Sequence, residues 1–349
     1  MKIAKIEPAR IDNFLDFNKK SFPERKNTSE RFKYQFIENP LLQDKEHPHG
    51  YLCYNDNDEI AGQFMASPFE FHLSGRDYKG YFGCDYYVSE NSRGISGAVL
   101  ACKAIRSYRP YFAIGLTETA KKIHLSLGTK VLGNLRKFIW VRNLINPLLI
   151  TAKLYSKEGA KEGYYKNRRS PEKISSYGEE FVLADNSDGW NNYHWTDTLE
   201  FSRSPEFLKW RFFGTLKGYY FYLSKKSKNQ SYFVVRKSMW RGMQFLLLLD
   251  YKVPYQDEKA FLAILKASKL LAKELGCDGV ITFSSHMFFD QGLKKSFFFK
   301  IGNQNLILTN ADIDSRESSI NKREFVYATI ADSDIDFDFD EGLCEYGFK

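Results

Sequence analysis

The stretch from Cys84 to Ala104 constrains the fold more than any other part of the sequence. Its pattern predicts a short strand over 84–88, a polar turn, and a helix that opens at Ile95. A helix that begins in this way leaves several backbone N–H groups without helical partners, and the helix dipole adds to their positive charge. Gly94 and Gly97 keep the backbone accessible to a bulky ligand. The stretch therefore predicts a site for an anion, and a diphosphate is the natural ligand.

Two neighbouring residues support this interpretation. Arg93 places a positive charge beside the turn, and Ala98 lets the helix pack closely on its neighbours. The stretch contains neither G-x-x-x-x-G-K-[ST] nor G-x-G-x-x-G, the two best-known phosphate loops. The order of the surrounding elements must therefore identify the kind of site.

The composition is that of a globular chain with room for two domains. Its 349 residues exceed the usual size of one domain, and 43% of them are hydrophobic. The net charge of +8 suits an anionic ligand such as a nucleotide, a coenzyme or a nucleic acid. Five scattered cysteines without a C-x-x-C pair argue against a disulfide framework and against a zinc site. They favour a reducing cytoplasm.

The sequence predicts no membrane span. The first residues lack the apolar core of a signal peptide, and no apolar run reaches the length that crosses a bilayer. The longest candidate, 138–152, is interrupted by Arg142 and Pro147. We expect a soluble, cytoplasmic protein.

In the first half the predicted elements follow the order β-α-α-β-β-β-α-β-α-β. Asn55-Asp56-Asn57-Asp58 is a strong hairpin signal between strands over 51–54 and 60–71. A strand over 79–88 leads into the helix at Ile95. Three meandering strands followed by β-α-β-α-β predict a mixed sheet with helices on both faces, which is an α/β (α+β mixed sheet) architecture.

This order, with a long central strand feeding an R-G-I-x-x-A-x-L helix, resembles the GNAT superfamily of acyl-CoA-dependent acetyltransferases. In that family a Q/R-x-x-G-x-G/A loop holds the coenzyme pyrophosphate through backbone N–H groups. The match here begins at Asn91, with Gly94 as the central glycine and Ser96 at the last position. The resemblance implies acetyl-CoA as co-substrate, bound by Val88, Asn91, Arg93, Gly94, Ile95, Ser96, Gly97 and Ala98.

The same resemblance implies catalytic residues. The family commonly carries A-x-x-x-Y-x-x-x-G-F, whose Tyr protonates the leaving thiolate. The frame from Ala120 to Thr129 fits, with His124 at the Tyr position. A histidine can protonate a thiolate at neutral pH, and a polar residue on a helix face is the alternative. Asp85 is the candidate general base, with Glu118 as second choice.

The second half repeats the order helix, three strands, helix, strand, helix, strand, so the resemblance is to a tandem GNAT protein. The segment 203–212 resembles an R-x-P-x-F-L-x-W-R-[FY] segment of bacterial tandem acetyltransferases, some of them encoded among polysaccharide-synthesis genes. The turn at 254–258 has no glycine and two acids, which would repel a pyrophosphate. We expect domains at 1–142 and 191–312, a linker at 143–190 and a strand with an acidic tail at 313–349.

Two charged segments have open interpretations. Residues 164–169, Tyr-Tyr-Lys-Asn-Arg-Arg, fit either a solvated connector or a contact to a nucleic acid or a sugar nucleotide. Residues 331–349 alternate acids with apolar residues, which is typical of an edge strand or an exposed acidic arm.

The sequence thus predicts an N-acetyltransferase that moves an acetyl group to an amine of a small molecule, an amino sugar or sugar nucleotide by analogy with the tandem relatives. The attack is direct, because neither a G-x-S-x-G elbow nor a recognisable Cys–His signature is present. Two alternatives stay open. One is a Fem-type transferase that uses aminoacyl-tRNA, and the other is a non-catalytic binding protein with two degenerate GNAT domains.

Overall fold

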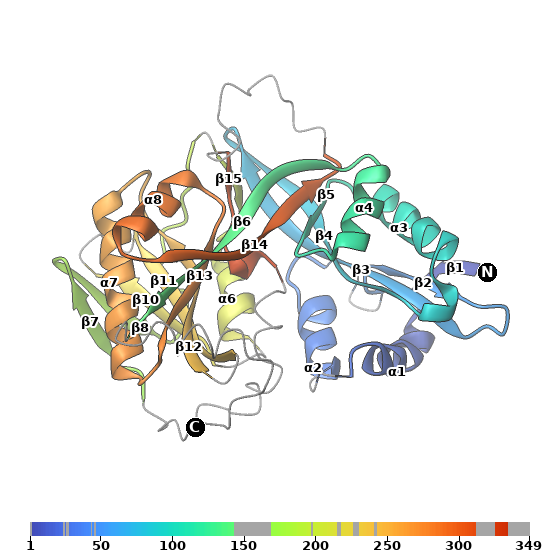
Figure 1. The fold of residues 1–349 in the computed structure, drawn as a ribbon, viewed down its shortest axis with the longest axis horizontal. Coiled ribbons are helices and arrows are strands. Elements are labelled where there is room, and N and C mark those ends of the chain that lie inside the picture. The colour runs from blue at the N-terminus through green and yellow to red at the C-terminus, as the bar shows by residue number, and fades with distance from the viewer. Residues whose placement is uncertain are drawn as a thin grey trace.

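The structure, a computed structural model, describes residues 2–23, 25, 28–42, 44, 47–142, 169–196, 198–214, 218–225, 230–240, 243–311 and 325–333. The chain forms two lobes joined by two long strands that cross between them (Figure 1). Residues 2–126 build one lobe, residues 169–295 build most of the other, and β6 and β14 lie between them.

The first half has the predicted element order. Its helices and strands are β1 (Lys2–Lys5), α1 (Ile11–Ser21), α2 (Thr28–Phe32), β2 (Gly50–Tyr54), β3 (Ile60–Leu73), β4 (Arg76–Val88), α3 (Ile95–Ser107), β5 (Tyr111–Ile114), α4 (Glu118–Ser126) and β6 (Lys130–Val141). One-turn 3-10 helices cover Pro8–Arg10 and Glu90–Ser92, and a π-helical turn covers Lys33–Ile37 directly after α2. The Asn55 side chain accepts the backbone N–H groups of Asn57 and Glu59, which forms the predicted hairpin turn.

The second half repeats much of this order. Its elements are β7 (Lys173–Ser176), β8 (Glu179–Ala184), β9 (Leu199–Phe201), α6 (Pro205–Phe213), β10 (Tyr220–Ser224), β11 (Tyr232–Trp240), β12 (Met243–Lys252), α7 (Glu258–Glu274), β13 (Gly279–Ser284), α8 (Met287–Lys295), β14 (Phe299–Thr309), β15 (Val326–Tyr327) and a 3-10 helix at Ile330–Asp332. Helix α6 begins at a serine cap: the Ser204 hydroxyl accepts the N–H of Phe207, and Pro205 occupies the first turn.

The two halves exchange their last strands. The order along the central sheet is β4-β5-β14-β6-β13-β12, so β14 pairs with β5 of the first half, and β6 pairs with β13 of the second. In register, Ile307 lies opposite Ile114, and Phe138 lies opposite Thr282. Strands on both sides of the predicted domain boundary after residue 142 therefore belong to one continuous sheet.

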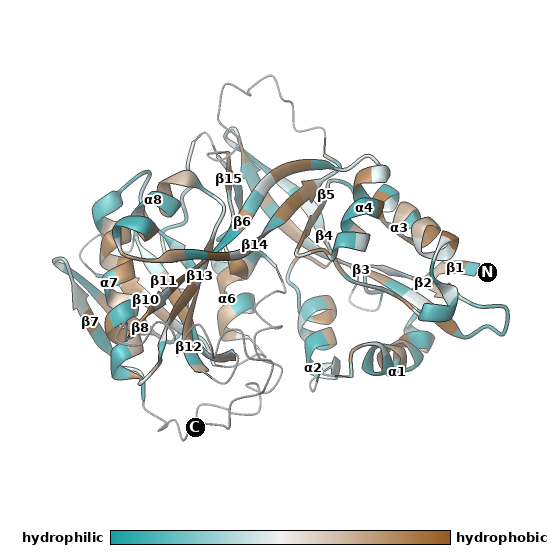
Figure 2. Cartoon of the chain, in the orientation of Figure 1, coloured by the Kyte–Doolittle hydropathy of each residue, from teal (hydrophilic) through white to brown (hydrophobic). Residues whose placement is uncertain are grey.

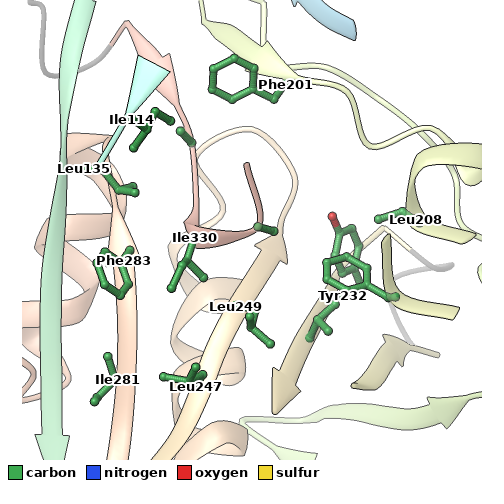
Figure 3. Close-up of a cluster of buried hydrophobic side chains, with 14 of the residues drawn as sticks. Ile114, Leu135, Phe201, Leu208, Tyr232, Leu247, Leu249, Ile281, Phe283 and Ile330 are labelled. Carbon is green, nitrogen blue, oxygen red and sulfur yellow. The ribbon is translucent and has the colours of Figure 1, made fainter. Parts of the chain in front are cut away.

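One large apolar cluster also spans both halves. Ile114 and Leu135 of the first half share it with Leu247, Phe283 and Ile330 of the second (Figure 3). Brown, hydrophobic positions gather on the strands and on the inner faces of the helices (Figure 2). Burial of this shared surface favours a fixed arrangement of the two lobes.

The mixed sheet with helices is confirmed. The hairpin β7–β8 lies within 143–190, predicted as linker, because β8 pairs with β10 at the edge of the sheet. Most of the 164–169 segment, and the acidic tail beyond residue 333, lie outside the described residues. Within the described part of the chain, no helix has the length and apolar character to cross a membrane.

Candidate active site

The turn between β4 and α3 is open, as an anion site requires. Gly94 adopts φ +102°, and a Cβ added there would find no atom within 4 Å. It precedes α3 without a side-chain cap, and Ala98 is the first residue whose N–H bonds back to Gly94, at 3.2 Å. The N–H groups of Ile95 and the two residues after it donate to no other described residue. These donors are therefore available to a ligand.

Two residues, Arg93 and Gly97, shape this turn. The Arg93 Nε donates to the Val88 carbonyl at 3.3 Å, and its guanidinium lies 3.4 Å from Glu90. This bond keeps the positive charge beside the open amides, with the side chain 58% exposed. Gly97 lets α3 approach β4, because a Cβ there would lie 3.1 Å from the Tyr86 hydroxyl.

Below the turn, β4 and β5 diverge. These parallel strands pair in register only at Tyr81–Tyr111 and Phe82–Phe112. Beyond Phe82, β4 bends away at Asp85, which has φ +48°, next to the bulge in its pairing with β3. The two strands therefore separate beyond these pairs, which leaves a gap in the strand pairing on the side of the N-terminus of α3.

His124 lies at this gap, fully buried, and it is paired with a tyrosine. Its Nδ1 lies 2.7 Å from the Ala120 carbonyl, and its Nε2 lies 2.8 Å from the Tyr111 hydroxyl. A carbonyl only accepts hydrogen bonds, so Nδ1 carries the proton and Nε2 accepts from the Tyr111 O–H. Burial lowers the pKa of His124 and raises that of Tyr111 well above its usual value. Both groups are therefore neutral at pH 7.

Asp85 lies on the other face of the sheet, which α1 and α2 cover. Its carboxylate is 2.6 Å from Arg25 and 3.7 Å from Arg31, and its side chain is 5% exposed. Burial alone would raise the pKa of Asp85, but the charges of Arg31 and Arg25 outweigh it and lower the pKa. A carboxylate held in this way is a weak proton acceptor.

Glu118 is the first residue of α4, and its side chain is 80% exposed, 3.5 Å from Lys121. The structure thus brings His124 and the loop 88–98 to one face of the sheet. It places Asp85 on the opposite face and turns Glu118 toward solvent.

A pocket opens on the face opposite His124, at the same point of β4. Its volume is about 680 Å³, a value that includes open solvent. Gly83 and Cys84 of β4 form part of its wall. Six aromatic side chains from both halves line it: Tyr34, Phe69, Phe82, Phe201, Phe207 and Trp210. Ala331 and Asp332 of the C-terminal 3-10 helix complete it.

Arg203 holds this C-terminal wall in place. Its guanidinium makes two hydrogen bonds of 2.7 Å to the Asp332 carboxylate and further bonds to Asp250, and all three side chains are at most 4% exposed. Arg211 Nε donates to the Ala331 carbonyl at 3.2 Å. The two arginines of the 203–212 segment therefore bind the chain around residue 331, which the sequence did not predict.

The corresponding turn of the second half is closed. The Asp257 side chain caps α7 by accepting the N–H of Ala260 at 3.0 Å, so the helix start satisfies one of its own donors. Strands β12 and β13 stay paired over four residue pairs, from Phe245–Gly279 to Leu248–Thr282. The helix start of the second half is therefore capped by a side chain, whereas that of the first half is not.

Tyr111 is not among the site residues predicted from the sequence. A Cβ at Gly83 would overlap the Tyr111 hydroxyl, so the ring lies directly against that glycine. The glycine in a strand interior was the available signal, because such a glycine often marks a close approach. The register of β4 against β5 determines which residue approaches Gly83, and this register cannot be predicted from the sequence of either strand.

No protein-family model matches the sequence, and no curated protein matches it at the level of sequence. Solved structures do match the fold. N-myristoyltransferase of Saccharomyces cerevisiae, with bound myristoyl-CoA, is 11% identical with a TM-score of 0.57 over 88% of this chain and 82% of its own. A GCN5-related N-acetyltransferase from Anabaena variabilis is 14% identical, with a TM-score of 0.56 over 88% and 72%. A probable N-acyltransferase from Enterococcus faecalis is 12% identical, with a TM-score of 0.56 over 88% and 71%.

The order of elements, the open turn after β4 and the divergence of β4 from β5 agree with these likenesses. The chain has the mixed α/β fold of the GNAT acyl-CoA N-acyltransferases.

Proposed function

We propose that this protein is an acyl-CoA-dependent N-acyltransferase that transfers an acyl group to the amine of a small molecule. The observation that carries the proposal is the uncapped, open start of α3 at Gly94, placed where β4 and β5 diverge. A helix start of this kind holds a diphosphate, and the gap between the strands holds the arm that extends from it.

The fit of the coenzyme follows from the residues present. The N–H groups from Ile95 to Gly97 would hold a diphosphate, and Arg93 would add a positive charge beside it. An extended strand from Val88 back to Gly83 covers about 16 Å, and a pantetheine arm laid along it would bring the thioester toward Gly83. Ile95 is 81% exposed and Val99 42%, so both offer apolar contact beside the loop.

The reaction is a direct attack. The amine nitrogen bonds to the thioester carbonyl carbon, the C–S bond breaks, and the thiolate leaves with a proton. We assign to His124 the protonation of the leaving thiolate, since it lies where β4 and β5 separate. Asp85 holds Arg25 and Arg31 against β4, and we assign Glu118 no part in catalysis.

We further propose that the two halves are two GNAT-like units in tandem, with domains at 1–142 and 191–312 that share the exchanged strands. The second half, whose turn is closed by Asp257, supplies walls of the pocket through Phe201, Phe207 and Trp210. The aromatic lining favours an amine on an apolar body over an amino sugar. The described cysteines are free, which suits a cytoplasmic protein.

Calorimetry with acetyl-CoA, and then with longer acyl-CoAs up to myristoyl-CoA, tests the proposal. We expect micromolar binding of at least one of them to the wild-type protein. Gly94→Glu should abolish it, because the new side chain places a carboxylate at the open amides. Gly178→Glu is the matched control, since Gly178 also has a positive φ and open space but lies in the β7–β8 turn. An absence of heat at millimolar coenzyme would overturn the proposal and favour a non-catalytic protein.

A further inference from the structure

Two histidines and an aspartate from both halves of the chain meet at the end of β3. In register, His72 of β3 lies opposite Asp77 of β4 on one side and opposite Glu200 of β9 on the other. His194 precedes β9, and its ring stacks on the ring of His72, with the centroids 3.9 Å apart and the planes 7° apart. One ring nitrogen of each histidine and one carboxylate oxygen of Asp77 lie within 4.8 Å of one another. Three side chains of the kinds that bind metal ions therefore converge between the halves.

The outer part of this cluster is a hydrogen-bonded pair that solvent can reach. His72 Nδ1 lies 2.9 Å from Asp77 Oδ1. A carboxylate only accepts hydrogen bonds, so the proton between these two atoms belongs to the imidazole. The Asp77 side chain is 76% exposed and that of His72 is 12% exposed. A cation can therefore arrive from solvent along Asp77 and take the place of this proton.

His194, the inner member of the cluster, lies against a buried carboxylate. Its Nδ1 is shielded from solvent and lies 3.4 Å from Glu200 Oε2. Glu200 is fixed in turn, because Lys252 Nζ donates to it at 2.5 Å and the Trp195 N–H donates to it at 3.1 Å. Metal-binding histidines commonly have a carboxylate at their second ring nitrogen, which sets the orientation of the ring and the nitrogen that carries the lone pair. Glu200 is placed to serve His194 in this way.

We propose that His72, Asp77 and His194 form a binding site for a divalent transition-metal ion, and that Zn²⁺ fits it best. Two imidazole nitrogens and one carboxylate oxygen are a donor set that zinc accepts, with water at the fourth position. Mg²⁺ and Ca²⁺ prefer oxygen donors throughout. The ligands come from β3, from β4 and from the segment before β9, so a bound ion ties the two halves together beside the pairing of β3 with β9.

Binding requires side-chain movement but no change of the sheet. In a tetrahedral zinc shell with bonds of about 2.0–2.2 Å, neighbouring ligand atoms are about 3.3 Å apart, so the separations of up to 4.8 Å here must shorten. A metal ion lies near the plane of each imidazole that binds it, so the two stacked rings must tilt toward each other. Asp77 is free to rotate on the surface, and the pairing of β3 with β4 holds its backbone opposite His72.

Calorimetry with zinc chloride on the full, untagged chain tests the site. We expect one ion per chain with a micromolar Kd, and no heat from magnesium chloride at the same concentrations. His72→Ala and His194→Ala should each weaken zinc binding by about 100-fold or more, since a direct ligand matters at least as much as its supporting carboxylate. His47→Ala is the matched control, because it removes a histidine from an exposed His–Asp pair, His47 Nδ1 lying 2.7 Å from Asp44, and its Kd should stay within about twofold of wild type.

Asp77→Asn keeps the test decisive even if the histidine variants fail to fold. Its side chain is mostly exposed, so the fold should survive, and zinc binding should weaken about tenfold. A second readout is Co²⁺, whose visible absorption becomes intense in a four-coordinate site. Wild-type protein should show this absorption, and Asp77→Asn should reduce it.

Urea unfolding shows whether the ion stabilises the folded chain. Zinc at a hundred times its Kd should raise the ratio of folded to unfolded protein about 100-fold in the wild type. An absence of heat with millimolar zinc, or a zinc Kd that Asp77→Asn and both histidine variants leave unchanged, would overturn the site. Either outcome would mean that the stacked rings serve packing alone. The proposed acyl transfer would stand in both cases, because it uses none of these three residues.

Discussion

The indole of Trp210 stacks on the ring of Tyr34, with the ring centroids 4.7 Å apart and the planes 8° apart. The Trp210 Nε1–H also donates to the Tyr34 carbonyl at 3.0 Å. Trp210 lies on α6 of the second half, and Tyr34 lies in the π-helical turn of the first. These contacts, together with the exchanged strands, fix the pocket that both residues line.

Trp210→Ala should lower the free energy of unfolding by about 2–4 kcal/mol. This is somewhat less than the loss of about 3–5 kcal/mol that is typical of a fully buried aromatic side chain, because Trp210 is only half-buried. Trp210→Phe keeps an aromatic face on Tyr34 and loses the indole hydrogen bond, so it should cost about 1 kcal/mol. Urea unfolding followed by far-UV circular dichroism measures both. Equal losses for the two variants would show that stacking contributes nothing.

Arg203→Ala should be more damaging, by about 3–5 kcal/mol, because it leaves the carboxylates of Asp250 and Asp332 buried without their cation. Arg93→Ala is the control, since Arg93 is mostly exposed and its loss should stay within about 0.5 kcal/mol. Thermal and urea unfolding provide the measurement. A wild-type stability for Arg203→Ala would mean that residues 325–333 are not held through this guanidinium.

Gly83→Ala should destabilise the protein by about 1–3 kcal/mol, because the added methyl group overlaps the Tyr111 hydroxyl. The same substitution in a Tyr111→Ala background should cost less, since the collision partner is absent. Gly133→Ala on β6 is the control, as a Cβ there meets only ordinary contacts of 3.5 Å or more. Purely additive losses in the double variant would contradict the contact between Gly83 and Tyr111.

Stability should fall on the acid side in two steps with different origins. The folded pKa of His124 lies below its ordinary value of 6.5, so its contribution is present above pH 6.5 and is lost as the pH falls below it. The pKa of Asp85 lies below 3.8, so its contribution is present above that value and is lost only at lower pH. His124→Gln should flatten the first step and Asp85→Asn the second. Urea midpoints of the wild type and of both variants, measured from pH 8 to pH 3, test this. Identical pH profiles for all three proteins would contradict the prediction.

Much of the fold could be predicted because its signals are local. The hairpin at Asn55, the Ser204 cap of α6 and the turn at Gly94 depend on residues a few positions apart. The hairpin β7–β8 was missed, since its strands are short and follow a charged segment that dominates the local composition. The role of Arg203 was missed because its partner Asp332 lies 129 positions away.

The sequence by itself determined the order of helices and strands in the first half, the open glycine turn after β4, and the loss of that turn in the second half, because periodicity, caps and turn residues act over short spans. Only the tertiary structure decided the exchange of β6 and β14, the aromatic pocket between the halves, and the meeting of Tyr111 with Gly83 and His124. Strand register and side-chain packing set these contacts, and they depend on the whole sheet at once.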